Sequence, residues 1–287
     1  MTDPKPKIAY QGEPGANSHV ACNNRFPDHE PLPCATFEDA FAAVHDGRAA
    51  LGMIPIENSV AGRVADIHHL LPNAGLYIIG EYFLPIRHQL VGIKGAPLGD
   101  VKRVRSHIMA LGQCRIAIAE LGLQTLVAAD TAGAAREIAE LGNPSEAAIA
   151  SDLAADIYGL DILRADIEDA DHNTTRFIIM SREDERVALA DDQPVITSLI
   201  FKVRNVPAAL YKALGGFATN GINMTKLESY QLDGRFSATQ FYLEVEGHPD
   251  SEAMGHALDD LHHYSESVTV LGVYAPHQYR LDQAAAQ

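Results

Sequence analysis

Two threonines and an arginine stand together just before an apolar stretch of the chain. The segment Asp171-His-Asn-Thr-Thr-Arg-Phe-Ile-Ile-Met180 places Thr174, Thr175 and Arg176 at the predicted start of a strand. A threonine hydroxyl can donate a proton to a leaving oxygen when neighbouring groups stabilise it, and a guanidinium can hold a carboxylate with two parallel hydrogen bonds. The same residues also suit a β-branched strand start with an exposed arginine. The pattern alone does not separate the two interpretations.

Small polar residues follow several predicted strands, at the points where helices are predicted to begin. In open α/β sheets, ligands bind beyond the carboxyl ends of the strands. Helix N-termini offer unpaired N–H groups and about half a positive charge. Several such ends facing one cleft would bind carboxylates without lysines, although each is also an ordinary helix cap. The positions are Asn17-Ser18, Asn58-Ser59, Ser106 and Asp130-Thr131.

The chain carries a large excess of acidic residues. Of its 287 residues, 22 are Lys or Arg and 38 are Asp or Glu, so the formal net charge is −16. Such a chain lacks the basic surface that nucleic acids require, and an anionic membrane face repels it. An anionic ligand must therefore be attracted by local groups inside a cleft, against the global field.

Hydropathy, cysteines and histidines set further bounds on the class of protein. No run of about 18 apolar residues occurs, so we expect no membrane span, and the first eight residues lack a signal-peptide core. The three cysteines form no CxxC pair, and the 13 histidines show no HExxH spacing. We therefore expect a cytoplasmic protein with no metal site.

Strands and helices alternate through the first 180 residues. Residues 8–11 and 51–56 predict buried strands, and each is followed by a helix start. Between them, Thr36 is predicted to begin a helix that Gly47 ends. The alternation is typical of a mostly parallel α/β sheet with covered faces. The pattern restarts near residue 101, which indicates two lobes. Residues 181–194 are charged and proline-ended, and they predict a linker.

The residues beyond this linker predict a compact unit. Its order is βαββαβ, the split ferredoxin-like arrangement. Asp233-Gly234 predicts a hairpin turn, and the last eight residues, 280–287, carry little signal. Strands are expected at 195–203, 222–231, 236–247 and 267–274, and helices at 207–221 and 250–263.

Five motifs, in sequence order, resemble those of prephenate dehydratases. They are YQGEPGANS (10–18), IPIENSVAGRV (54–64), GEYFLPIRHQL (80–90), VRSHIMALGQC (104–114) and NTTRF (173–177). The resemblance implies a catalytic domain over residues 1–180, with two α/β lobes like those of type II periplasmic binding proteins. The lobes would be about 8–85 with 165–180, and 86–164.

The C-terminal unit resembles the ACT regulatory domain of the same family. The resemblance rests on NVPAALYKAL (205–214) and GINMTKLESYQ (221–231). It implies a linker over 181–194, an ACT domain over 195–275 and a tail over 276–287.

This family converts prephenate to phenylpyruvate, carbon dioxide and water in phenylalanine biosynthesis. Aromatisation of the ring drives the reaction, so the resemblance implies no cofactor. It implies that Thr175 donates the proton to the leaving hydroxyl and that Arg176 and Phe177 shape the site. The substrate is a small dicarboxylate, and the residues implied to bind it are Gly15, Ala16, Asn17, Ser18, Asn58, Ser59, Ser106, His107, Asn173 and Thr174. Because His107 follows Ser106 at a helix start, we interpret it as a binding or capping residue rather than the acid.

The resemblance also implies regulation and assembly. L-Phenylalanine would be the effector, and ACT and catalytic contacts would give a homodimer or homotetramer. The chain departs from the family pattern at three places: Ala208 replaces the usual glycine, Tyr230-Gln231 replaces Arg-Pro, and Ile108-Met109 replaces Pro-Gln. A dimerisation module without an effector therefore stays open. The residues implied to bind the effector are Asn205, Ala208, Ala209, Leu210, Asn223, Thr225, Glu228 and Ser229.

Two other functions stay open at this stage. The first is the same chemistry on arogenate, the amino analogue of prephenate, which would give L-phenylalanine directly. The second is a non-catalytic sensor of small anions or amino acids, since both parts of such folds bind ligands; the intact NTTRF segment argues against it. No mutase helix precedes residue 8, so we expect a monofunctional enzyme.

Overall fold

The chain forms two compact units. A computed structural model describes residues 5–190, 193–231 and 238–285. The first unit contains Met1–Val64 and Tyr82–Phe177, and the second contains Ala65–Glu81 and Ile178–Gln287. Within the part of the chain that the structure describes, no helix is long and apolar enough to cross a bilayer.

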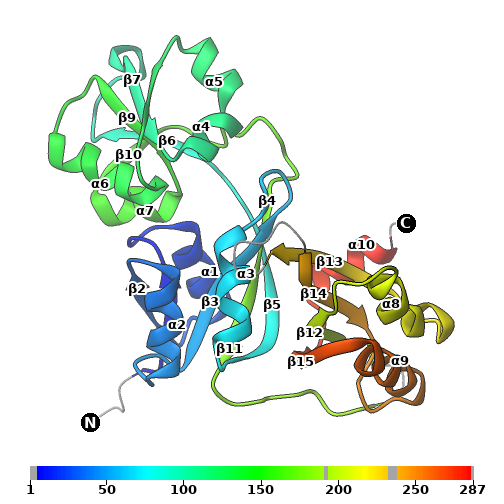
Figure 1. The fold of residues 1–287 in the computed structure, drawn as a ribbon. Helices are drawn as coiled ribbons and strands as arrows, with labels where there is room; N and C mark the ends of the chain where they lie inside the picture. Colours follow the sequence, from blue (N-terminus) through cyan, green and yellow to red (C-terminus); the bar gives the residue numbers. More distant parts are fainter. Residues whose placement is uncertain (1–4, 191–192, 232–237, 286–287) are drawn as a thin grey trace. The chain divides into compact units, whose positions relative to one another are not determined.

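The first sheet has the strand order β2-β1-β3-β11-β5, with β4 paired to β3 (Figure 1). β1 pairs in parallel with β2 and β3, and α1 and α2 are the crossover helices that parallel neighbours require. The α2 helix begins as predicted, since the Thr36 hydroxyl accepts the Asp39 N–H at 3.1 Å. The bounds are β1 Lys7–Gln11, α1 Asn17–Arg25, β2 Glu30–Cys34, α2 Phe37–His45, β3 Leu51–Asn58, β4 Gly62–Arg63, β5 Tyr77–Pro85 and β11 Thr174–Ser181.

The second sheet has the order β10-β6-β9-β7-β8 (Figure 1). It is mixed, because β7 pairs in parallel with β8 and β9 while β6 pairs antiparallel with β9 and β10. The expected mostly parallel sheet is therefore wrong here, since a short apolar run does not reveal its strand's direction. The bounds are β6 Gln89–Ile93, β7 Arg103–Ser106, α4 Ile108–Gln113, α5 Arg115–Glu120, β8 Gln124–Val127, α6 Thr131–Leu141, β9 Glu146–Ala150, α7 Asp152–Tyr158 and β10 Leu160–Arg164.

Helices cover both faces of this second sheet, and the alternation of side chains along β9 shows how. Ala147 and Ile149 pack in one apolar cluster with α4 and α5, whereas Ala148 and Ala150 pack in another with α6 and α7. Successive strand side chains point to opposite faces, so one five-residue strand supplies both clusters. These helices position the polar residues at the strand ends.

Two of the predicted helix starts are wrong. Ser59 lies in the hairpin between β3 and β4, where Asn58 pairs with Gly62. Ser106 is the last residue of β7, and His107 caps α4 because its Nδ1 accepts the Met109 N–H at 3.3 Å. In both cases an adjacent residue takes the capping or turn-forming role, which a list of small polar residues does not distinguish.

The remaining predicted starts fit better. Asp130 caps α6 as predicted, accepting the Gly133 N–H at 2.7 Å. The α1 helix begins at Asn17, but its cap position is Ala16 and no side chain caps it.

The second unit contains the predicted order β12-α8-β13-β14-α9-β15. Its antiparallel sheet has the strand order β13-β14-β12-β15 (Figure 1). Phe201, Phe217 and Leu243 lie fully buried in the core between the sheet and the two helices. The predicted turn at Asp233-Gly234 lies outside the described residues. The bounds are β12 Ile196–Val203, α8 Ala209–Thr219, β13 Met224–Gln231, β14 Ala238–Glu246, α9 Glu252–Tyr264 and β15 Ser265–Tyr274.

The unit also contains two segments outside this core order, α3 (Ala65–Leu70) and α10 (Gln278–Ala285). The α10 helix was not predicted. Its Arg280 has Nη2 at 2.8 Å from Glu81 Oε2 and at 3.2 Å from Glu244 Oε2. Both glutamate side chains are fully buried, so the C-terminal residues complete a buried ionic cluster.

Candidate active site

The segment singled out for chemistry lies at the start of β11, in the first unit. Asn173, Thr174 and Arg176 are buried, and Thr175 is half-buried. Phe177 is also buried and packs in the interior. It can therefore shape a site through packing, whereas Thr175 is the one of the two threonines that is not buried.

The side-chain amide of Asn58 lies at the centre of the site. Its Oδ1 accepts the backbone N–H groups of Val60 at 3.0 Å and Ala61 at 2.8 Å. Because those groups can only donate, the amide has one possible orientation. Its Nδ2 then donates to Asn173 Oδ1 at 2.8 Å and to Thr175 Oγ1 at 3.0 Å. Since Thr175 Oγ1 accepts this hydrogen bond, its own proton is directed elsewhere.

Ser59 connects the β3–β4 hairpin to the start of β11 through three hydrogen bonds. Its hydroxyl donates to His172 O at 2.7 Å and accepts the Thr174 N–H at 2.9 Å, and its own N–H donates to Thr174 O at 2.9 Å. The serine proton is therefore engaged within the protein. What Ser59 does in this structure is hold the threonine segment beside Asn58.

Two residues that the sequence reasoning missed continue the network. Gln113, at the end of α4, accepts the Asn173 Nδ2–H at its Oε1 at 3.1 Å, and His88 Nε2 lies 2.9 Å from the same oxygen. Both residues fall inside the motifs 80–90 and 104–114. For Gln113 the available signal was a polar side chain directly after the apolar stretch 108–112, whereas His88 lies between Arg87 and Gln89 and gave no such signal.

Arg176 is paired with an acid of its own chain. Its Nη1 lies 2.8 Å from Glu57 Oε1, and its guanidinium carbon is 5.9 Å from the centroid of the Phe83 ring. The arginine side chain is only 3% exposed, compared with 32% for Glu57. A substrate carboxylate would therefore have to share the guanidinium with Glu57 or displace it.

The predicted binding loop at 12–18 contacts the helices α6 and α7 of the same unit. Ser151 Oγ donates to Gly15 O at 2.5 Å, and Tyr158 OH donates to Pro14 O at 2.9 Å. Arg136 holds both Glu13 oxygens, with distances of 2.7 and 3.0 Å. The Gly15 N–H donates to His19 Nδ1 at 3.0 Å. The backbone carbonyls of Pro14 and Gly15 are therefore used for contacts with α7.

The backbone at Gly15 leaves no room for a side chain at this position. Its φ is +94°, in the region that favours glycine. A Cβ there would lie 2.6 Å from the Cα of Ala154. The neighbouring positions Ala16, Asn17 and Ser18 lead into α1, and Ser18 is buried.

Ser106 and His107 lie at the carboxyl end of β7. Ser106 is fully buried and donates to Ile149 O at 2.7 Å. His107 caps α4, which fits the interpretation of it as a capping residue. The next two residues, Ile108 and Met109, are 57% and 44% exposed, so the departure from the family pattern puts apolar surface beside the cap.

Burial favours the neutral form of two histidines and three cysteines in this unit. Burial lowers the pKa values of His19 and His88 below the ordinary 6.5. Burial also raises the pKa values of Cys22, Cys34 and Cys114, so each is a thiol rather than a thiolate nucleophile. Among residues 5–190, 193–231 and 238–285, no three His, Cys, Asp or Glu side chains gather as metal ligands would.

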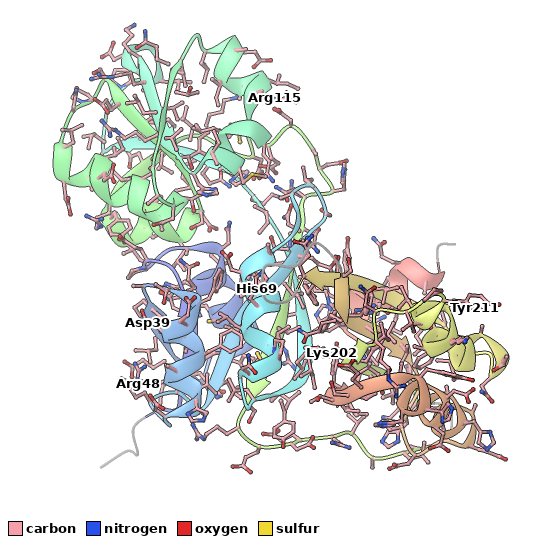
Figure 2. The ribbon with its side chains drawn as sticks, viewed as in Figure 1. Asp39, Arg48, His69, Arg115, Lys202 and Tyr211 are labelled. Carbon is pink, nitrogen blue, oxygen red and sulfur yellow. The ribbon has the colours of Figure 1, made fainter. Side chains whose placement is uncertain are left out.

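The predicted effector residues divide into two groups in the second unit. Asn205, Ala208, Ala209, Leu210 and Ser229 line a cavity of about 530 Å³. Tyr211, on the same cavity wall, extends from α8 and is 81% exposed (Figure 2).

Three predicted effector residues do not line this cavity, and each bonds within the sheet. Asn223 Nδ2 donates to Glu246 Oε2 at 3.0 Å, and Thr225 Oγ1 donates to Glu244 O at 3.4 Å. Glu228 pairs with Lys226 at 3.3 Å.

Comparison with known proteins gives consistent matches. The family model described as prephenate dehydratase matches residues 8–185. A Komagataeibacter europaeus protein, named bifunctional N-acyl-homoserine lactone acylase/prephenate dehydratase, is 53% identical over 274 residues, or 95% of this chain and 97% of its own. An Arabidopsis thaliana protein, named arogenate dehydratase/prephenate dehydratase 1, chloroplastic, is 38% identical and covers 95% of this chain and 72% of its own. The crystal structure of prephenate dehydratase in complex with L-Phe from Arthrobacter aurescens has a TM-score of 0.85 at 31% identity, over 94% of this chain and 89% of its own.

Proposed function

Because the chain belongs to the prephenate dehydratase family, we propose that it converts prephenate to phenylpyruvate, carbon dioxide and water on the route to L-phenylalanine. The observation that carries the proposal is the 3.0 Å hydrogen bond from Asn58 Nδ2 to Thr175 Oγ1. It leaves the Thr175 proton to point away from Asn58. A hydroxyl held in this way can donate a hydrogen bond to a leaving oxygen of the substrate.

In the proposed reaction, the C–O bond of the ring hydroxyl and the bond to the ring carboxylate both break. The electron pair of the carboxylate bond enters the ring, which becomes aromatic, and the carboxylate leaves as carbon dioxide. The oxygen leaves with the C–O electron pair and gains a proton to become water. A threonine hydroxyl is a weak acid, so Thr175 acts by a hydrogen bond that strengthens as charge develops on the oxygen, and solvent supplies the net proton.

The other site residues orient this step. Asn173 and Ser59 hold the start of β11 against the Asn58 hairpin through hydrogen bonds of 2.7–2.9 Å. Arg176, shared with Glu57, offers a local positive charge for the substrate dianion inside a chain with a net charge of −16. Orientation of the ring is the main task left to the protein, since aromatisation drives the chemistry.

The proposal includes the expected domain organisation. It has a catalytic domain of two lobes similar to type II periplasmic binding proteins, a linker over 181–194 and an ACT domain over 195–275. The alternating elements of the first unit and the βαββαβ order of the second support it. We propose a homodimer or homotetramer, which is testable by light scattering.

L-Phenylalanine is the proposed effector. The cavity of about 530 Å³ beside Ala208 supports this, and so does the L-Phe complex of the Arthrobacter aurescens protein. The alternative is a dimerisation module without an effector. Thermal shift and turnover with and without L-phenylalanine decide between them, and no change in either would remove the effector.

Two relatives bring further candidate substrates. The Arabidopsis protein's name favours arogenate as a second substrate, and the Komagataeibacter protein's name favours hydrolysis of an N-acyl-homoserine lactone as a second activity. Arogenate differs from prephenate in the side chain's amino or keto group. The acylase reaction is a hydrolysis, in which water cleaves the amide into a fatty acid and homoserine lactone.

The test is turnover by the purified protein with prephenate, arogenate and an N-acyl-homoserine lactone side by side. We expect the fastest turnover with prephenate. We also expect Thr175→Ala to lower kcat on prephenate by at least about a hundredfold, with an unchanged circular dichroism spectrum. No turnover of prephenate or arogenate would contradict the proposal and favour a sensor or a hydrolase.

A further inference from the structure

A buried histidine is connected to the candidate proton donor by an unbroken row of side-chain hydrogen bonds. The row runs from His88 through Gln113, Asn173 and Asn58 to Thr175, with distances of 2.9, 3.1, 2.8 and 3.0 Å. All five residues belong to the first unit. His88 and Thr175 are the two ends of the row, so an effect of His88 on the reaction passes through the amides between them.

The backbone around His88 fixes where its ring lies. The His88 N–H donates to Glu168 Oε2 at 2.9 Å, and its carbonyl accepts the Ile167 N–H at 2.9 Å. The residue is 3% exposed. Arg87 lies 2.7 Å from the other Glu168 oxygen, so the carboxylate is charge-paired as well as hydrogen-bonded to the backbone.

The direction of every hydrogen bond in the row is determined from the Asn58 end. The N–H groups of Val60 and Ala61 require the Asn58 oxygen to face them, so Nδ2 faces Asn173 Oδ1. The Asn173 Nδ2 then faces Gln113, whose oxygen must accept. That same oxygen lies 2.9 Å from His88 Nε2. An amide oxygen cannot donate, so Nε2 of His88 carries the proton.

The Nε2–H group of His88 gives Gln113 Oε1 a second hydrogen-bond donor, beside Asn173 Nδ2. Without it, Gln113 Oε1 would have a single donor among these side chains, and its amide would be free to rotate. Rotation would turn the Gln113 NH₂ group toward the NH₂ group of Asn173, and both are donors. Asn173 would then be oriented from the Asn58 side alone, so the acceptor for Asn58 would be held less firmly.

We propose that His88 is a positioning residue for the reaction of this site, acting through Gln113, Asn173 and Asn58 to hold the Thr175 hydroxyl toward the substrate. The inference rests on the proposed function. Burial lowers the pKa of His88, which agrees with a neutral ring that donates from Nε2. The residue acts by orientation and transfers no proton in the reaction.

Kinetics of four variants test the proposal. His88→Phe keeps the ring volume and removes the donor, and His88→Gln places an amide N–H near the position of Nε2. We expect His88→Phe to lower kcat on prephenate about tenfold with KM changed less than about twofold, and His88→Gln to recover most of the loss. In a Gln113→Leu background, His88→Phe should have no further effect, because the route through Gln113 is already broken.

The matched control is His248→Phe. His248 is also a buried histidine whose Nε2 lies 3.0 Å from a carbonyl oxygen, that of Val187, but it lies in the second unit. This variant should lose stability without losing kcat. The proposal is overturned if His88→Phe keeps wild-type kcat per folded molecule, if His88→Gln gives no recovery, or if the effects of His88→Phe and Gln113→Leu multiply.

A second measurement is independent of turnover. Long-range ¹H–¹⁵N spectra of the histidine-labelled protein report which ring nitrogen carries the proton. We expect the Nε2–H form for His88, with a signal that moves in Gln113→Leu. An Nδ1–H form, or no response to Gln113→Leu, would overturn the inference even if His88→Phe does not fold. Absence of wild-type turnover with an Nε2–H His88 would instead contradict the proposed function alone.

Discussion

The candidate site and the second unit both bury polar side chains, but the site joins neutral groups whereas the second unit pairs charged ones. The site joins Asn58, Asn173 and Thr175 by neutral hydrogen bonds of 2.8–3.0 Å. The second unit instead buries the carboxylates of Glu81 and Glu244 beside Arg280. Neutral amides fix direction at a modest desolvation cost, whereas buried charges are costly unless fully paired. We therefore expect changes at the site to affect turnover and changes at the ionic cluster to affect stability.

Arg280→Met should have the largest effect on stability. It removes a cation that lies within hydrogen-bond distance of two buried carboxylates, so we expect a loss of about 3–5 kcal/mol in the free energy of unfolding. Urea denaturation followed by circular dichroism measures it. Arg164→Met is the control, because Arg164 and Glu120 form an exposed pair that contributes less than about 1 kcal/mol. Equal losses in the two variants would remove the contrast between the regions.

Asn58→Asp should have a large effect on turnover and a small one on stability. The new carboxylate keeps an oxygen for the Val60 and Ala61 N–H groups but turns a second oxygen toward Thr175 Oγ1 and the Asn173 amide, which loses its donor. The threonine proton then points to this carboxylate instead of the substrate. We expect kcat on prephenate to fall about a hundredfold.

The control for this variant is Asn220→Asp. Asn220 lies in the second unit, and its Nδ2 is likewise a hydrogen-bond donor, to Gly216 O at 2.8 Å. A kcat for Asn58→Asp within about threefold of wild type would show that the direction of the amide does not control the reaction.

Ala208→Gly is a change in the second unit that should stabilise the protein rather than destabilise it. Ala208 has φ +62°, in the left-handed region that favours glycine. We expect the free energy of unfolding to rise by about 1 kcal/mol. Ala218→Gly, at an exposed position within α8, should lower it by a similar amount. A loss of stability in Ala208→Gly would mean that the backbone here is unstrained.

Acid should destabilise the first unit slightly through its buried histidines. His88 and His19 have lowered pKa values in the folded state, so below about pH 6.5 the unfolded chain binds more protons. The free energy of unfolding therefore falls as the pH drops from about 6.5 toward the lower folded-state pKa values. His88→Gln should make this fall shallower in urea titrations on either side of about pH 6.5. An identical slope in wild type and variant would show that His88 does not titrate on unfolding.

Local patterns predicted most of the elements. The Thr36 and Asp130 caps and the βαββαβ order followed from residue types and periodicity within short windows. The sequence also placed Thr175 and Asn58 in one site, through the motifs. The neutral network itself was not predictable, because its partners are 25 to 117 residues apart and depend on side-chain geometry.

The ionic cluster and the direction of the strands were also not predictable, because both depend on pairing between residues far apart in the sequence. Arg280 meets Glu81 across 199 residues, and a short tail rich in alanine gives no sign of such a partner. The strand β10 was missed, and the antiparallel direction of β6 with it. In each case the local sequence is compatible with several tertiary contacts, and packing selects one.

The most direct test of the account compares Thr175→Ser with Thr175→Val on prephenate. Serine keeps the hydroxyl that Asn58 holds and loses the methyl group, whereas valine keeps the shape and loses the hydroxyl. If the oriented hydroxyl assists departure of the leaving oxygen, kcat of the serine variant should exceed that of the valine variant by at least about fiftyfold, with similar unfolding midpoints. Equal kcat values for the two variants would contradict the account.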